Sequence, residues 1–186
     1  MFTHLTAILI AIALLVTVPL ALRALGLDQS CRDGRGATAT TAARWVAAAS
    51  LLAPRGVVAG LLAALWLLAT VGLSWRHRRA PLTHLVTVAW LPTAAAWLMA
   101  DRLGIRPLGF SSHLVMLTAA HFHHAGFGVS ALLSTIGARR ALAVHQVGML
   151  LVAAGLTVAH ATGLDASALP GSRWLEPAGA ICIVAA

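Results

Sequence analysis

Residues 5–22 read LTAILIAIALLVTVPLAL, a stretch without a single charged side chain. About 20 apolar residues are enough for one helix to cross the hydrocarbon core of a bilayer. Similar stretches recur along the 186-residue chain, which is 60% hydrophobic and 10% charged. A soluble fold cannot hide so much apolar surface, because a chain of about 150 residues buries only about 70% of what it exposes when unfolded. We therefore expect an all-α, multi-pass protein of the cell membrane, with the lipid bilayer as its partner.

The hydropathy pattern predicts a polytopic bundle of five to six transmembrane helices. Between the first two spans we expect a polar loop over residues 28–43 and a short interfacial helix over 44–53, because Pro54 and Arg55 interrupt the apolar run there. The last apolar residues are too few to cross a bilayer, so we expect either a half-inserted sixth helix or, as the favoured alternative, a chain that is truncated at this point. The predicted spans are residues 5–22, 56–74, 81–100, 113–137 and 141–163, with a partial span at 177–186.

The charge balance is 13 basic residues, all of them arginine, against 5 acidic ones. The arginines lie singly or in short runs between apolar stretches, which is typical of cytoplasmic loops and lipid headgroup contacts and not of a nucleic-acid-binding protein. The short basic loops 75–79 and 139–140 follow the second and fourth spans. This pattern favours a cytoplasmic position for both loops and for the N-terminus.

Small residues recur at four-residue spacing near the start of the second span, at Gly56, Gly60 and Ala64. Residues four apart share one helix face, and small side chains let a neighbouring backbone approach closely. We expect this face to take part in helix–helix association.

The chain contains nine histidines, most of them within or at the ends of predicted spans. Polar groups in hydrocarbon are costly and by default mark functional sites. At ~100° per residue, His121 and His123 point about 160° apart, whereas His121 and His124 can share a partner. Imidazoles without a thiolate pair or carboxylate nearby favour haem iron, copper or zinc. The predicted cofactor ligands are His121, His123 and His124, with His121 and His124 for a metal ion, and His84, His113, His145 and His160 as partners.

The segment HFHHAGF, residues 121–127, resembles the core motif of the YndJ-like family of bacterial multi-pass membrane proteins, with His124 in place of an aromatic residue. The resemblance implies a membrane protein and carries no assigned activity. The stretch 113–124 is also similar to the histidine-bearing helix of haem–copper oxidase subunit I. That similarity implies that His121 and His123 are axial ligands of two different haems. The rest of the oxidase pattern is missing, so oxygen reduction is not inferred.

Two other functions are compatible with the residues. A small transporter or proton-linked permease would use histidines as proton relays, although Asp101, Asp165 and Glu176 are expected in loops, which leaves the spans without a carboxylate. A structural membrane partner without cofactor would bond its histidines within the bundle. No buried acid is available to orient a histidine beside a serine, so the sequence assigns no enzymatic reaction.

Overall fold

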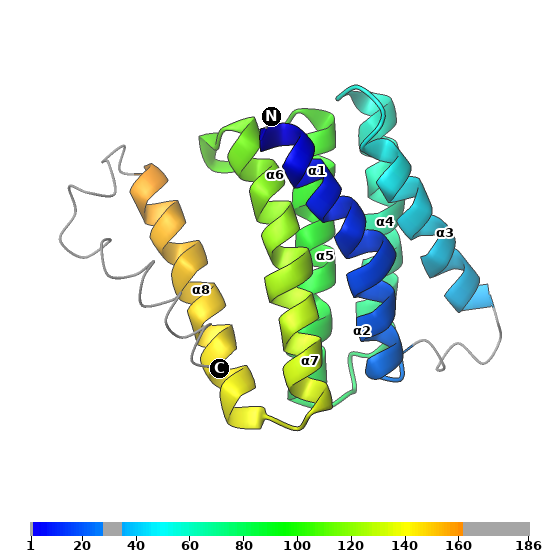
Figure 1. Cartoon of the computed structure of the whole chain (residues 1–186), viewed down its shortest axis with the longest axis vertical. Helices are drawn as coiled ribbons and strands as arrows, with labels where there is room; N and C mark the ends of the chain where they lie inside the picture. Colours follow the sequence, from blue (N-terminus) through cyan, green and yellow to red (C-terminus); the bar gives the residue numbers. More distant parts are fainter. Residues whose placement is uncertain (1, 28–34, 162–186) are drawn as a thin grey trace.

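The computed structural model of the chain describes residues 2–27 and 35–161, and every regular element among them is helical. The expected all-α class is confirmed. Some elements continue directly into the next, so the described residues form six helical rods (Figure 1). In chain order the elements are α1 (Phe2–Ile12), η1 (Ala13–Thr17), α2 (Val18–Ala24), α3 (Arg35–Ser50), α4 (Val57–Arg76), α5 (Leu82–Leu103), η2 (Pro107–Gly109), α6 (Ser112–His121), η3 (Phe122–Val129), α7 (Ser130–Thr135) and α8 (Arg139–Ala161).

The rods form one bundle in which successive rods run in opposite directions (Figure 1). The most extensive contacts join α4 to α5 and α3 to α4, and α5 also packs along α6 and η3. The first rod lies against the fifth through α1 with α6 and η1 with η3. Helix α8 stands at the edge of the bundle, where it contacts α7, η3 and η2. The rod α6–η3–α7 therefore lies between the first rod, α5 and α8.

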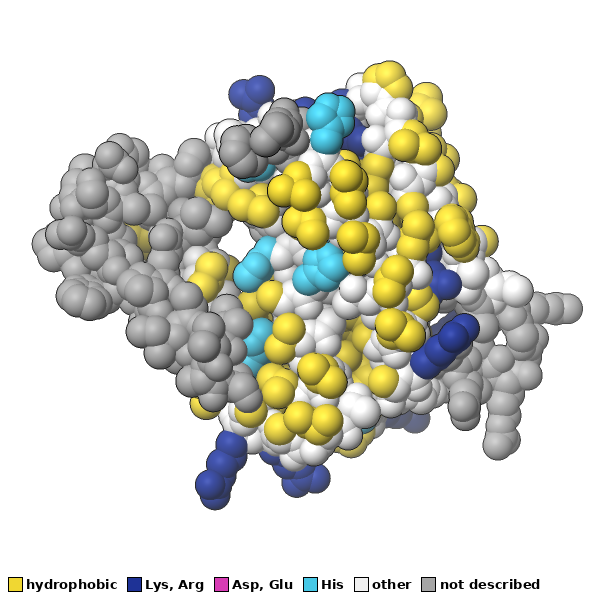
Figure 2. All heavy atoms as spheres, viewed as in Figure 1, with side chains coloured by type: hydrophobic (Ala, Val, Ile, Leu, Met, Phe, Trp, Pro, Cys, Tyr) yellow, Lys and Arg dark blue, Asp and Glu magenta, His cyan; other side chains and the backbone are white. Residues whose placement is uncertain are grey.

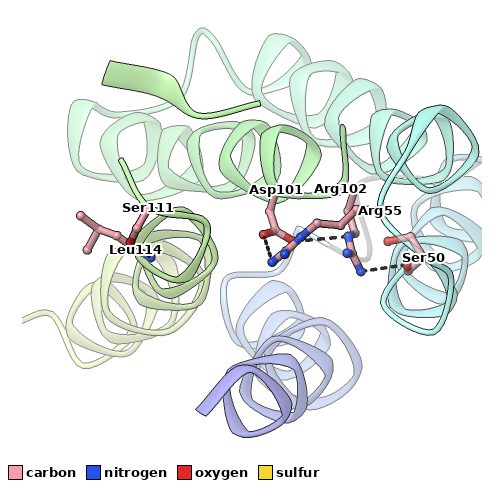
Figure 3. Close-up of polar contacts among 6 residues, drawn as sticks. All are labelled: Ser50, Arg55, Asp101, Arg102, Ser111 and Leu114. Atoms are coloured by element: carbon pink, nitrogen blue, oxygen red, sulfur yellow. Dashed lines mark hydrogen bonds and ion pairs between the residues drawn. The ribbon is translucent and has the colours of Figure 1, made fainter. Parts of the chain in front are cut away.

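The ends of the rods follow from particular residues. Helix α5 stops at Gly104 and the turn between α7 and α8 contains Gly137, both in the left-handed region with φ of 73° and 72°. Glycine adopts this conformation without the Cβ clash that other residues meet. Ser111 caps α6 by accepting a hydrogen bond of 3.3 Å from the backbone N–H of Leu114 (Figure 3).

Helix α3 differs from the loop and interfacial helix expected for this region. It begins at Arg35, inside the segment 28–43, and buries Ala43 and Ala47 against its neighbours α4 and η1. Figure 1 shows it running along the bundle, antiparallel to α4. The N-terminus and the basic turn 75–79 consequently lie at opposite ends of the bundle, instead of on the same side as the loop pattern suggested. The packing of small alanines along one face outweighs the local preference of Thr and Gly for a loop.

The outside of the bundle is apolar. Three described helices are long and apolar enough to cross a membrane: His4–Ala24, Val57–Arg76 and Leu82–Leu103. On the face in Figure 2, hydrophobic side chains are spread over the middle of the bundle, interrupted by a few histidines, and arginines project at its upper and lower ends and on its right flank. Large hydrophobic side chains remain 60–67% exposed on four rods, at Leu20, Leu68, Leu132 and Leu150. The expected partial span 177–186 and the end of the span 141–163 lie outside the described residues.

The stripe of small residues is used within the chain. A Cβ at Gly60 would overlap the Leu103 side chain, so the glycine allows α4 and α5 to cross closely. The N–H of Gly56 donates a hydrogen bond of 2.8 Å to the Arg102 carbonyl, at the same end of α5. Ala64 is half-buried one turn further along α4. Two of the three small residues thus join α4 to α5.

Candidate functional site

The HFHHAGF segment lies where the fifth rod changes from α-helix to π-helix, at Phe122. Short π-helical segments are rare and occur frequently at functional sites. The first rod contains a second π-helical segment, η1, and the two π-helical segments contact each other. The wider π-helical turn alters the direction of each side chain, so the residues of the segment reach several neighbouring helices.

His123 points toward α4 and is completely buried. The Trp66 indole N–H donates a hydrogen bond of 3.1 Å to His123 Nε2, and His123 Nδ1–H donates one of 2.8 Å to the Ala119 carbonyl. Since a carbonyl can only accept, these partners define the neutral imidazole with its proton on Nδ1. Both ring nitrogens are occupied, which leaves His123 without a free position for a ligand in this arrangement.

His124 points toward the first rod. Its Nε2–H donates a hydrogen bond of 2.9 Å to the Leu9 carbonyl, and its Nδ1 lies 3.3 Å from the Thr17 hydroxyl, from which it can accept. A Cβ at Gly128 would lie 2.7 Å from the Thr17 methyl group, so the glycine permits the contact of η1 with η3. His124 is therefore engaged in joining the two π-helical segments.

The apolar members of the segment pack on α5. Phe122 stacks on Trp90 with ring centroids 5.1 Å apart. A Cβ at Gly126 would lie 3.2 Å from the same indole, closer than ordinary packing allows. Phe122 and Gly126 thus form the surface on which the Trp90 ring packs. The indole N–H of Trp90 donates a 2.6 Å hydrogen bond to Gln146 of α8.

His121 faces a cavity between the α6–η3 junction and α8. The cavity has a volume of about 610 Å³ and its walls include Trp97, Phe110, Phe122 and Met149. His121 is among the residues that line it, and the buried Nε2 atom of the same ring has no hydrogen-bond partner among the described residues. An unpaired polar atom in apolar surroundings is costly and calls for an explanation. His121 is the histidine of the motif whose Nε2 has no hydrogen-bond partner among the described residues.

His145 attaches α8 to the motif. Its Nε2–H donates a hydrogen bond of 2.9 Å to the Ala125 carbonyl in η3, and its Nδ1 is buried without a partner among the residues described. The structure thus brings His145, one of the predicted partners, to the η3 part of the motif.

The structure separates the remaining predicted ligands. His113 is exposed near the start of α6, whereas His84 lies at the far end of the bundle beside Arg139. The side chain of His160 lies outside the described residues. Within the described part of the chain, no three His, Cys, Asp or Glu side chains come together in a way that could hold a metal ion. His124 borders the same cavity as His121, but its nitrogens are directed to the first rod.

A buried ion cluster at the end of α5 is absent from the sequence-based expectations. Asp101 was expected in a loop; it lies in the last turn of α5, and its side chain is fully buried. Arg55 Nη2 donates to Asp101 Oδ1 at 2.7 Å, and Arg102 Nε lies 3.3 Å from Oδ2. Arg102 also donates a 3.2 Å hydrogen bond to the Ser50 carbonyl, which ties α3 to α5 (Figure 3). The available signal was the Asp–Arg pair directly after an apolar run, because charges at such a position need partners.

The comparison with protein families decides the family. A family model described as YndJ-like protein matches residues 8–186. The chain belongs to the YndJ-like family. Comparisons with curated proteins and with solved structures gave no match. In this YndJ-like protein the HFHHAGF segment is the place where the fifth rod contacts the first rod, α4, α5 and α8.

Proposed function

We propose that this YndJ-like protein is an integral membrane protein in which all six described rods cross the bilayer, with the shorter α3 returning the chain from the end of α2 to the start of α4. Three of the five long rods are the helices whose length and composition suit a membrane. The other two are the rods 112–135 and 139–161, each about 35 Å long at ~1.5 Å per residue, which exceeds the ~30 Å hydrocarbon core. The exposed Leu132 and Leu150 support the assignment, because exposed apolar patches of this kind are rare on soluble monomers.

The basic turns predict the orientation of the bundle. Cytoplasmic loops carry an excess of arginine, so the end with turns 75–79 and 136–140 should lie in the cytoplasm and the N-terminus outside. After replacement of Cys31 and Cys182 by serine, a single cysteine can be introduced by Ala80→Cys or by Ile105→Cys. On intact cells a membrane-impermeant maleimide should label the Ile105→Cys chain and should reach the Ala80→Cys chain only after permeabilisation. The reverse pattern would contradict this orientation.

We propose further that the cavity beside His121 binds a lipophilic cofactor that imidazole can ligate, with haem as the leading candidate. The proposal rests on His121, which lines this apolar cavity and whose buried Nε2 has no partner among the described residues. Haem needs one or two axial ligands and otherwise apolar walls, and the cavity volume lies within the ~300–1,000 Å³ typical of small-molecule sites. A bare transition metal ion has less support, because it takes about four donor atoms in a typical site.

A purified, detergent-solubilised full-length chain tests the proposal. Haem titrated into the wild type should produce a stoichiometric Soret band, and native mass spectrometry should detect the complex. His121→Ala should reduce binding at least about tenfold, because it removes the imidazole that would hold the iron, whereas His113→Ala, at an exposed position of the same helix, should bind as the wild type does. A wild type that binds no haem, or a His121→Ala variant that binds equally well, would refute the assignment.

Two histidines favour a structural role that needs no cofactor. The rings of His123 and His124 are paired to Trp66 and to the Leu9 carbonyl, so their contribution is to join helices. In membranes such interhelical bonds contribute about 0.6 kcal/mol on average. If haem titration fails and every histidine variant alters stability alone, a scaffold within the membrane becomes the better assignment.

A further inference from the structure

A second hollow, of about 260 Å³, lies at the end of the bundle where α4 turns into α5 and α7 turns into α8. Thr83 and His84 of α5 line one side of this hollow, and Ser134 and Arg139 line the other. Leu133 and Leu142 close it toward the bundle. The lining therefore combines hydroxyl groups, an imidazole and a guanidinium with an apolar floor.

The surroundings of this hollow are strongly positive. Arg78 and Arg79 lie in the turn after α4, and Arg140 neighbours Arg139 at the start of α8. Among residues 2–27 and 35–161 the acidic side chain is Asp101, which lies at the opposite end of the bundle and is paired there. The pKa of His77 in the same turn is lowered, first by partial burial and then by His84 and Arg76. The positive charge at this end thus comes from arginine at neutral pH.

We infer that this hollow binds the phosphate group of an anionic phospholipid in the adjoining leaflet. The end of a membrane-spanning bundle lies at the depth of the headgroups, where basic side chains attract anionic lipids. The planar guanidinium of Arg139 can donate two parallel hydrogen bonds to phosphate oxygens, and hydroxyl groups such as those of Thr83 and Ser134 can donate further ones. The exposed apolar surface along α7, which includes Leu132, is available to the acyl chains. This site is independent of the cavity beside His121.

Arg139 and Arg140 provide a matched pair of variants, because both are exposed and only Arg139 is among the lining residues of this hollow. Native mass spectrometry of the full-length chain can measure binding of phosphatidylglycerol, with phosphatidylcholine as the zwitterionic reference. Arg140→Gln should weaken binding by about fivefold or less, the general contribution of one arginine near an anionic surface. Arg139→Gln should weaken it by more than about tenfold, because the direct contact is lost as well.

Arg139→Lys retains the positive charge but lacks the planar guanidinium that donates two parallel hydrogen bonds. Its affinity for phosphatidylglycerol should lie between those of the wild type and Arg139→Gln. Unfolding temperatures in zwitterionic detergent should agree for all variants, since these side chains are exposed. Equal weakening by Arg139→Gln and Arg140→Gln would overturn the site and indicate a diffuse surface charge. Displacement of phosphatidylglycerol by an equimolar amount of glycerol phosphate would overturn the lipid assignment in favour of a soluble phosphate. Equal binding of phosphatidylcholine would also overturn it.

Discussion

Asp101→Asn is expected to lower the free energy of unfolding by about 3 kcal/mol. Removing one member of a buried ion pair typically costs about 3–5 kcal/mol, because the other charge stays buried without compensation. The Asp101 and Arg102 side chains are 0% and 7% exposed, whereas Arg55 is 36% exposed and can turn to solvent. The solvent access of Arg55 places the expected loss at the lower end of the range. Unfolding in mixed micelles with increasing sodium dodecyl sulfate measures the effect.

The isosteric change to asparagine keeps the volume of the side chain, so any loss reports charge and hydrogen bonding and not packing. Arg106→Gln, which removes an exposed charge in the connection after α5, is the matched control and should change stability by less than about 0.5 kcal/mol. Removing both charges by Asp101→Asn with Arg102→Gln should recover part of the loss, because no unpaired ion remains buried. A single variant as stable as the wild type would show that the cluster carries no net stabilisation.

His123→Leu is expected to destabilise the protein by about 2 kcal/mol. The substitution leaves the Trp66 indole N–H buried without its acceptor, and an unsatisfied buried donor costs about 1–3 kcal/mol. The Nδ1 bond to the Ala119 carbonyl is lost as well, although that carbonyl lies within a helix. The same unfolding titration measures the change.

A double-mutant cycle with Trp66→Phe isolates the bond from the packing. The single tryptophan change also removes ring volume from a fully buried site, so its own cost includes a cavity term. The coupling energy between positions 66 and 123 should be about 1 kcal/mol, within the range measured for interhelical bonds in membranes. Additive losses would contradict the bond, and an equal loss in the exposed His113→Leu variant would indicate a general effect of removing histidine.

The fold class and family followed from local features. Apolar runs without charge predict membrane helices whatever their neighbours do, and the YndJ-like resemblance of residues 121–127 required no packing. The first part of helix α3, before the helix expected from residue 44, was missed because its residues are rich in Thr and Gly, and a contact with α4 stabilises the helix there. Its presence reverses the position of the N-terminus relative to the basic turns. Whether a segment of this composition forms a loop or a helix depends on its burial against other helices, and the sequence pattern does not specify that burial.

In the candidate site, too, local geometry could be predicted from the sequence, whereas contacts between distant residues could not. Ideal α-helical geometry correctly separated the directions of His121 and His123, but it did not foresee the π-helical segment that begins between them. The partners of His124 come from residues 9 and 17, more than a hundred positions earlier in the chain. Likewise Asp101 and Arg55 meet through the α4–α5 contact. Pairings over such separations depend on how rods are rotated and aligned.

The order of residues alone determined that this chain is helical and suited to lipid, because hydrophobicity is a property of each side chain and adds up along a span. Only the tertiary structure decided which imidazole nitrogens find partners on neighbouring helices and which stay buried without one among the described residues. Hydrogen bonding requires two groups to meet at a defined distance and angle. That meeting is set by helix packing, and the packing of each rod depends on all the others at once.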